Sequence, residues 1–243
     1  MLLKSYALPE QRWPVFIAFI MAITIFWHPP FVEKGECAME SEEEKKFIQL
    51  PEPKKDSATA LEETLKERRS IRHYGDAPLT LSHISQLMWA AQGITHGRGF
   101  RTAPSAGALY PLEVYTVIGN VENLDAGIYH YQPKGHQLKP VKAGDHRKSL
   151  CSAGLSQSAI CNAPVSIVMT GVFERTTGKY GKRGVQYVFM EAGHAGQNVL
   201  LQAVSLNLGA VPVGAFDNQA VSRLMDLPES ETPLYILPVG RPK

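Results

Sequence analysis

Cysteine and net charge are two things of which this sequence has little. Its 243 residues include three Cys and no Cys-x-x-Cys pair, so a disulfide scaffold, a zinc ribbon and a thioredoxin-like site are excluded. The formal net charge is only +2, whereas nucleic-acid-binding domains usually carry a large basic excess on one face. Hydrophobic residues make up 44%, which excludes a disordered or low-complexity chain. The remaining class is a globular domain with a small-molecule site and no predicted metal.

A hydrophobic run long enough to cross a membrane is also missing. The apolar segment Pro14–Trp27 has no charge, but it is shorter than the roughly 20 residues that a spanning helix needs. Basic residues precede it, as in a secretory signal. A signal peptide, a short membrane anchor and a start assigned upstream of a cytosolic protein are the three alternatives. We assign residues 1–38 to a signal peptide or membrane anchor, and expect an exported or membrane-attached protein if this segment is real and a cytoplasmic one otherwise.

The next residues, 39–56, are polar. They contain the charged run Glu42–Lys46 and two prolines, at Pro51 and Pro53, which is typical of a solvated linker. We therefore predict that the folded domain spans residues 57–243.

Helical and strand periods both occur from Ser57 onward, without strict alternation. This favours an α+β fold with a mainly antiparallel sheet. We predict helices over Ser57–Arg68, Leu81–Gln92, Asp145–Ala153, Gly184–Leu208 and Asn218–Met225. We predict strands over Leu112–Ile118, Gly127–Tyr131, Gln137–Val141, Val165–Gly171 and Pro233–Val239, with a turn at Gln132–Gly135.

Four local clusters can carry chemistry. Arg68-Arg69-Ser70-Ile71-Arg72 offers a dense set of donors that suits a phosphate group. Two stretches rich in small residues, Pro104–Pro111 and Gly209–Phe216, allow a backbone to approach a ligand closely. The chain end Pro238–Lys243 adds two cations. Taken singly, each cluster is equally typical of an ordinary surface turn.

In this order, the four clusters resemble the nitroreductase-like flavin oxidoreductases over Leu61–Lys243. Lys179-Tyr180-Gly181 and Glu191-Ala192-Gly193-His194 make the sequence similar to the SagB-type branch, whose members oxidise azoline rings in modified peptides. The resemblance implies a mainly antiparallel sheet flanked by helices, with a long central helix at a dimer interface. One departure is Gly214, where other family members often have Glu near the flavin edge.

The resemblance also implies a role for each cluster, with FMN as the cofactor. Arg68, Arg69 and Arg72 would neutralise the FMN phosphate, and Ser70 would donate to the phosphate or the ribityl chain. The remaining implied cofactor contacts are Ser105, Ala106 and Gly107 from a second subunit, Pro212, Val213, Gly214 and Ala215 against the flavin ring, and Arg241 at the chain end.

Lys179 and Tyr180 are the implied acid–base pair, because oxidising an azoline ring requires removal of a proton as hydride leaves. The alternative for this pair is an ordinary surface loop between Gly178 and Gly181. Two other functions stay open. One is a generic NAD(P)H-dependent nitro or quinone reductase, and the other is a non-catalytic flavin-binding partner in a peptide-modifying complex. The substrate itself cannot be deduced from the sequence.

The long predicted helix, Gly184–Leu208, has apolar residues on more than one side, which favours burial against a second copy in a homodimer. Glu191 and His194 have the spacing of half a di-iron site. We reject a metal because no second copy of the motif exists, and expect a polar seam between two protomers instead. Cys151 and Cys161 can pair only in an exported domain, and the sequence leaves their state open.

Overall fold

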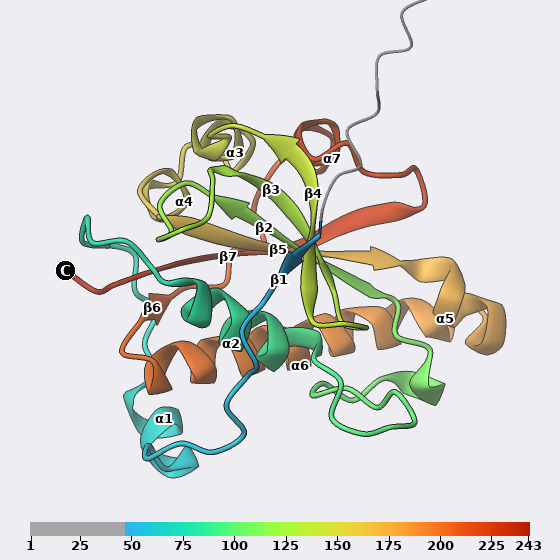
Figure 1. Cartoon of the computed structure of the whole chain (residues 1–243). Coiled ribbons are helices and arrows are strands. Elements are labelled where there is room, and N and C mark those ends of the chain that lie inside the picture. The colour runs from blue at the N-terminus through green and yellow to red at the C-terminus, as the bar shows by residue number, and fades with distance from the viewer. Residues whose placement is uncertain (1–46) are drawn as a thin grey trace, which may run out of the picture. The chain divides into compact units, whose positions relative to one another are not determined.

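The computed structural model describes residues 47–243, which form one seven-stranded antiparallel sheet with helices on both faces (Figure 1). The strands occur in the sheet in the order β1-β4-β3-β2-β5-β7-β6. Their bounds are β1 Ile48–Gln49, β2 Leu112–Ile118, β3 Gly127–Gln132, β4 Gln137–Ala143, β5 Val165–Val172, β6 Gly209–Ala210 and β7 Glu231–Gly240. The predicted α+β class is confirmed.

Helices α2 (Leu81–Gln92) and α6 (Arg183–Ser205) cover one face of the sheet (Figure 1). Thr80 caps α2: its side chain accepts a hydrogen bond from the His83 backbone N–H, and the His83 ring accepts one from the Thr80 N–H. Apolar side chains of the two helices then pack on the sheet. This core includes Ile84, Leu87 and Met88 of α2, Val188 and Val199 of α6, and Val114, Ile167 and Leu237 of the strands.

The other face is covered by α3 (Arg147–Ala153), α4 (Ser158–Cys161) and α7 (Asn218–Leu224) (Figure 1). Leu150, Ile160 and Val221 from these helices pack against Val168 and Ile236 of the strands. Because both faces are covered, the middle strands are buried on both sides, and β5 is buried at every position except its last, Val172. A disulfide joins Cys151 to Cys161 and so ties α3 to the end of α4.

Three elements differ from the predictions. β1 lies in the segment predicted to be a linker, where it pairs with β4, and the adjacent Leu50 is buried in the core. α1 is shorter than predicted, Leu61–Glu67, because Ala60 at its N-cap offers no side-chain acceptor. Residues 173–180, for which no helix was predicted, form helix α5 (Phe173–Tyr180), so Lys179 and Tyr180 lie in a helical turn rather than in a loop.

The N-terminal prediction concerns residues that lie outside the described part of the chain. Within residues 47–243, none of the helices combines the length and the apolar character needed to cross a bilayer.

Candidate functional site

The Arg68–Arg72 segment runs between the sheet edge and the chain end. Ser70 forms an isolated bridge with Ala210, and the Ile71 N–H donates to the Ala210 carbonyl at 3.1 Å. Gly209 has to be small, because a Cβ there would lie 2.6 Å from the Ile71 side chain. These backbone contacts bring the first predicted cluster next to the third, which begins at Gly209.

The four predicted arginines are placed differently. Arg72 is exposed and lines a cavity of about 320 Å³. Arg69 turns back on its own chain and donates to the carbonyls of Lys66 and Arg68. Burial lowers the pKa of the His83 imidazole, and the nearby charge of Arg241 lowers it further. Arg72 is thus the predicted cation that lines the cavity, and Arg241 lies near His83 at the start of α2.

The cavity beside Arg72 is walled by the stretch Val211–Ala215 and by Gln157, Ser158 and Ala159. Two bonds hold this stretch: the Val213 N–H donates to Ile236 O at 2.8 Å, and Gln157 Nε2 donates to Ala215 O at 2.7 Å. Gly214 is exposed, and within residues 47–243 its N–H makes no hydrogen bond. An open cavity with an adjacent cation and a free backbone donor suits a flat, anionic ligand.

A second cluster surrounds the loop at Ser105–Gly107. Gly107 has φ +65°, which favours glycine, and a Cβ there would lie 2.8 Å from Tyr180 Oη and 3.1 Å from Lys179 Nζ. Both side chains come from the last turn of α5, so the structure brings the predicted acid–base pair onto the predicted flavin loop. Tyr180 also packs edge-on against Tyr187 of α6, with ring centroids 5.1 Å apart.

Helix α5 is attached to the sheet through Arg175. Its guanidinium forms an ion pair with Glu113 at 2.6 Å and donates to the Tyr110 carbonyl at 3.0 Å. Glu113 also contacts the His130 ring at 2.8 Å. Burial raises the pKa of Glu113, but the bonds from His130 and Arg175 outweigh it and the pKa falls below its usual value. A charged Glu113 therefore holds α5, and with it Lys179 and Tyr180, in place.

The two clusters lie at different ends of α6. The Ser105–Gly107 loop lies near Glu191, in the N-terminal half of the helix, whereas the arginine segment meets β6, which follows the C-terminal end. From Glu191 to Ser205 the helix rises by roughly 20 Å at 1.5 Å per residue. Within the described residues, no member of the Ser105–Gly107 loop lines the cavity beside Arg72.

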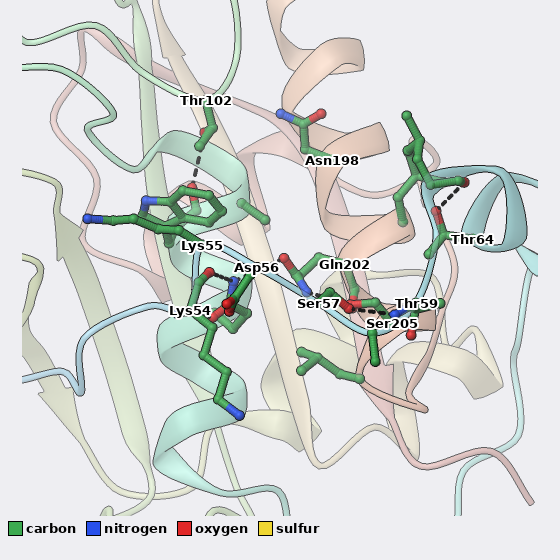
Figure 2. A pocket seen from close by; sticks show the side chains of 17 residues that line it. Lys54, Lys55, Asp56, Ser57, Thr59, Thr64, Thr102, Asn198, Gln202 and Ser205 are labelled. Atoms are coloured by element: carbon green, nitrogen blue, oxygen red, sulfur yellow. Dashed lines mark hydrogen bonds between the residues drawn. The ribbon is translucent and has the colours of Figure 1, made fainter.

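A larger cavity, of about 810 Å³, lies between α2, α6 and the segment that leads into α1. Figure 2 shows Asn198 and Gln202 of α6 and Thr59 of that segment around it. None of the predicted flavin or acid–base residues lines this cavity. Asn198, Gln202 and Ser205 make the α6 wall of this cavity polar.

The sequence analysis did not predict that Glu191 is buried. This side chain is 2% exposed, while His194, one turn later on the same helix, is exposed. Within the described part of the chain, no group of three His, Cys, Asp or Glu side chains could hold a metal. The repeat of buried positions Val188, Ala192, Ala195 and Val199 in α6 was the available signal, because Glu191 falls on the same face.

Residues 65–241 match the model of the Nitroreductase family. The chain belongs to this family. A protein of Methanocaldococcus jannaschii whose name calls it a nitroreductase is 43% identical over 194 residues, which cover 80% of this chain and 96% of that protein. Family membership makes the chain an oxidoreductase and confirms the predicted resemblance.

Two further similarities support the SagB-type branch of the family. The microcin B17-processing protein McbC of Escherichia coli is 33% identical over 132 residues, which cover 52% of this chain and 48% of McbC. The chain also resembles a chain of the solved E. coli microcin synthetase McbBCD complex with truncated pro-MccB17 bound. That match has a TM-score of 0.63 and 27% identity, and covers 88% of this chain and 84% of that one.

Proposed function

We propose that this protein is an FMN-dependent dehydrogenase that oxidises azoline rings in a modified peptide. The observation that carries the proposal is the contact of Lys179 and Tyr180 with the Ser105–Gly107 loop. In the SagB-type branch these are the residues beside which substrate and flavin would meet. Family membership and the similarity to McbC support the reaction class.

The residues beside the smaller cavity fit FMN. Arg72, with Arg68 nearby, would neutralise the phosphate, and Ser70 is exposed on the same segment. Pro212–Ala215 would lie along the flavin ring with the free Gly214 N–H directed to its edge, where a donor favours added negative charge. Bound FMN would supply a two-electron acceptor for hydride, with NAD(P)H as an electron donor in the generic-reductase alternative.

Lys179 and Tyr180 have the chemistry for the remaining proton. When an azoline ring loses hydride, one ring proton must also leave, and a neutral amine or a phenolate oxygen within reach can accept it. Glu113, through Arg175, keeps the helix that carries both side chains fixed on the sheet. Binding, orientation and proton removal are thus the work of different residues in this chain.

We propose further that the complete site needs two copies of the chain. A single chain holds its arginine cavity and its Ser105–Gly107 loop at different ends of α6. A two-fold axis through the middle of α6 brings the loop of one protomer to the cavity of the other. Gly193 is exposed, and a Cβ there would meet nothing within 4 Å, so a partner helix can approach closely.

The surface of α6 is complementary to itself. Phe189 and Met190 are 53% and 51% exposed in the N-terminal half of the helix. The larger cavity is lined by Leu201 and Gln202 in the C-terminal half. In an antiparallel pair of α6 helices, Phe189 and Met190 of one protomer would enter the larger cavity of the other. Burying each would contribute about 1.5–3 kcal/mol to association.

The decisive experiment compares two substrates in one preparation. We expect Lys179→Ala to lower turnover of a thiazoline-bearing peptide by about 10²-fold or more, the usual contribution of acid–base catalysis. The same variant should reduce a quinone or a nitroaromatic at nearly the wild-type rate, since no substrate C–H proton is removed there. Tyr180→Phe tests the partner hydroxyl in the same way.

Lys182→Ala is the matched control, because Lys182 is also an exposed cation, just beyond the end of α5. It should leave both activities unchanged. Equal losses on both substrates would show that Lys179 only supports the fold of α5. Unchanged azoline turnover would reject the acid–base role of Lys179. A wild type that reduces quinones and oxidises no azoline would favour the generic reductase. Bound flavin without any turnover would favour the non-catalytic partner.

A further inference from the structure

Glu191 is a buried carboxyl beneath the loop that carries the proposed substrate contact. It is 2% exposed, and its Oε1 makes no hydrogen bond within the described residues. Nothing in the proposed chemistry uses this group. A buried carboxyl without such a use is costly to keep, so its surroundings show what it can do.

Three side chains that carry hydrogen-bond donors, Gln92, Arg101 and Ser105, lie near Glu191. Gln92 is fully buried, and its Oε1 already accepts from the Arg101 guanidinium at 2.8 Å, which leaves its Nε2 unpaired. The Nε of Arg101 is also buried and unpaired among the residues that the structure describes. Ser105 Oγ accepts from the Tyr110 N–H at 2.9 Å, so its own proton is free to donate.

The donors and the burial act in opposite directions, and burial has the larger effect. Burial raises the pKa of the Glu191 carboxyl from its usual 4.5 to about 7, although Ser105, Arg101 and Gln92 lower it. The neutral carboxyl can still accept from one donor and can give its own proton to Ser105 Oγ. Neutral Glu191 therefore suits the closed, dry arrangement, while ionised Glu191 favours an arrangement that admits water.

The loop that Glu191 supports has the proposed acid–base pair on its other side. Ser105 lies over Glu191, and two residues further on Gly107 lies against Tyr180 Oη and Lys179 Nζ. A displacement of the loop at Ser105 would be passed to this contact, because the loop between the two positions is a single short turn.

We propose that Glu191 is a positioning residue that holds the Ser105–Tyr110 loop in place through Ser105 and thereby sets the contact of Gly107 with Lys179 and Tyr180. The catalytic consequence of this inference rests on the proposed function, whereas the contact between Glu191 and the Ser105–Tyr110 loop is a property of the folded chain. Arg101 is the charged side chain that acts on Glu191 directly, and it is influenced in turn by Glu113, Tyr110 and Arg175. Lys179 of α5 and His194 of α6 are exposed.

If Glu191 holds the loop in this way, opening of the Ser105–Tyr110 loop should depend on pH. When the loop opens and water reaches Glu191, its pKa returns toward 4.5, so opening releases a proton between the two values. Opening becomes easier by up to about tenfold per pH unit between 4.5 and 7, at most about 300-fold in all, and does not change further above 7. The sign is that of a raised carboxyl pKa: the closed loop is most stable at low pH.

Hydrogen exchange of peptides that cover residues 101–111 tests this directly, as protection factors corrected for the intrinsic effect of pH. We expect protection in the wild type to fall between pH 5 and 7 and to level off above 7. Glu191→Gln cannot ionise, so its protection should stay nearly constant over that range. His194→Gln, one turn away and exposed, is the control and should follow the wild type. A wild type without the step, or a Glu191→Gln variant that keeps it, would overturn the proposal.

Turnover provides a second measurement with a conservative rescue. Glu191→Gln should keep kcat for the thiazoline peptide within about threefold, whereas Glu191→Leu removes the polar partner of Ser105 and should lower it at least tenfold. His194→Leu should change neither activity nor exchange. Equal loss in both Glu191 variants would reject the positioning role. The exchange step needs no substrate, so a chain that shows it and oxidises no azoline would contradict the proposed function alone.

Discussion

At the scale of single residues, few of the predicted arginines are placed to contact the phosphate of FMN in the proposed site. Arg72 lines the cavity, Arg69 is bonded to its own backbone, and Arg241 is directed toward His83. We therefore expect Arg72→Ala to weaken FMN binding by about thirtyfold, which corresponds to about 2 kcal/mol for one lost charge-assisted contact. Titration followed by visible absorption measures the affinity, and the melting temperature should be unchanged because the Arg72 side chain is exposed.

Arg68→Ala should show a loss of the same direction, since Arg68 is half-buried on the same segment. Lys66→Ala removes an exposed cation of α1 that lies outside the motif, and it controls for a general loss of positive charge. Wild-type FMN affinity in both arginine variants would show that the phosphate is bound elsewhere.

The donor-rich segment was predictable from residue types alone, and the role of Glu191 was not. Three guanidiniums around Ser70 have no apolar pattern that would explain them, so a ligand was the natural interpretation. The buried state of Glu191 depends on the loop at Ser105, which packs on α6 only after the chain has folded. A carboxylate at a helical spacing from Val188 and Ala195 is the kind of local signal that could have indicated it.

At the scale of elements, the predictions were correct where a periodic pattern of apolar residues marks the buried side of a helix or strand. The middle strands and α2 are bounded by clear apolar periods, and β2 and α2 have the predicted bounds. α5 is short, mostly polar and contains Gly178, so its sequence did not indicate a helix, and the bonds from Arg175 hold it on the sheet. β1 has only two residues, and its pairing with β4 defines it.

The disulfide allows an element-scale prediction, because Gln157, Ser158 and Ala159 lie between its two cysteines and line the proposed FMN cavity. Without the bond, the unfolded chain gains freedom, and the α3–α4 turn is no longer tied at both ends. Cys151→Ser should lower the free energy of unfolding by about 2–3 kcal/mol and should also weaken FMN binding. Denaturant titration and flavin absorption measure the two effects.

Cys161→Ser removes the same bond, so it should give the same losses, and the double variant should be no worse than either single one. Larger losses in the double variant would mean that the cysteines act as two separate packing residues. Such a disulfide usually persists in an oxidising compartment, and the mass of the purified, unreduced protein would show whether it forms.

At the scale of the whole molecule, the proposed function requires association of two chains, because the two clusters lie at different ends of α6. Phe189→Glu places a charge in the proposed interface, where burying it without a partner costs at least about 2 kcal/mol. We expect this variant to weaken dimerisation at least about thirtyfold in sedimentation experiments. FMN affinity should fall in the same variant, because the Ser105–Gly107 loop would no longer reach the cavity of the other chain. Phe47→Glu, at an exposed apolar residue beside β1 on the sheet edge, is the control and should remain dimeric and bind flavin. A monomeric Phe189→Glu protein with wild-type FMN affinity would show that one chain completes the site alone, and the cavity beside Arg72 would then have to hold the whole cofactor without the loop that touches Lys179 and Tyr180.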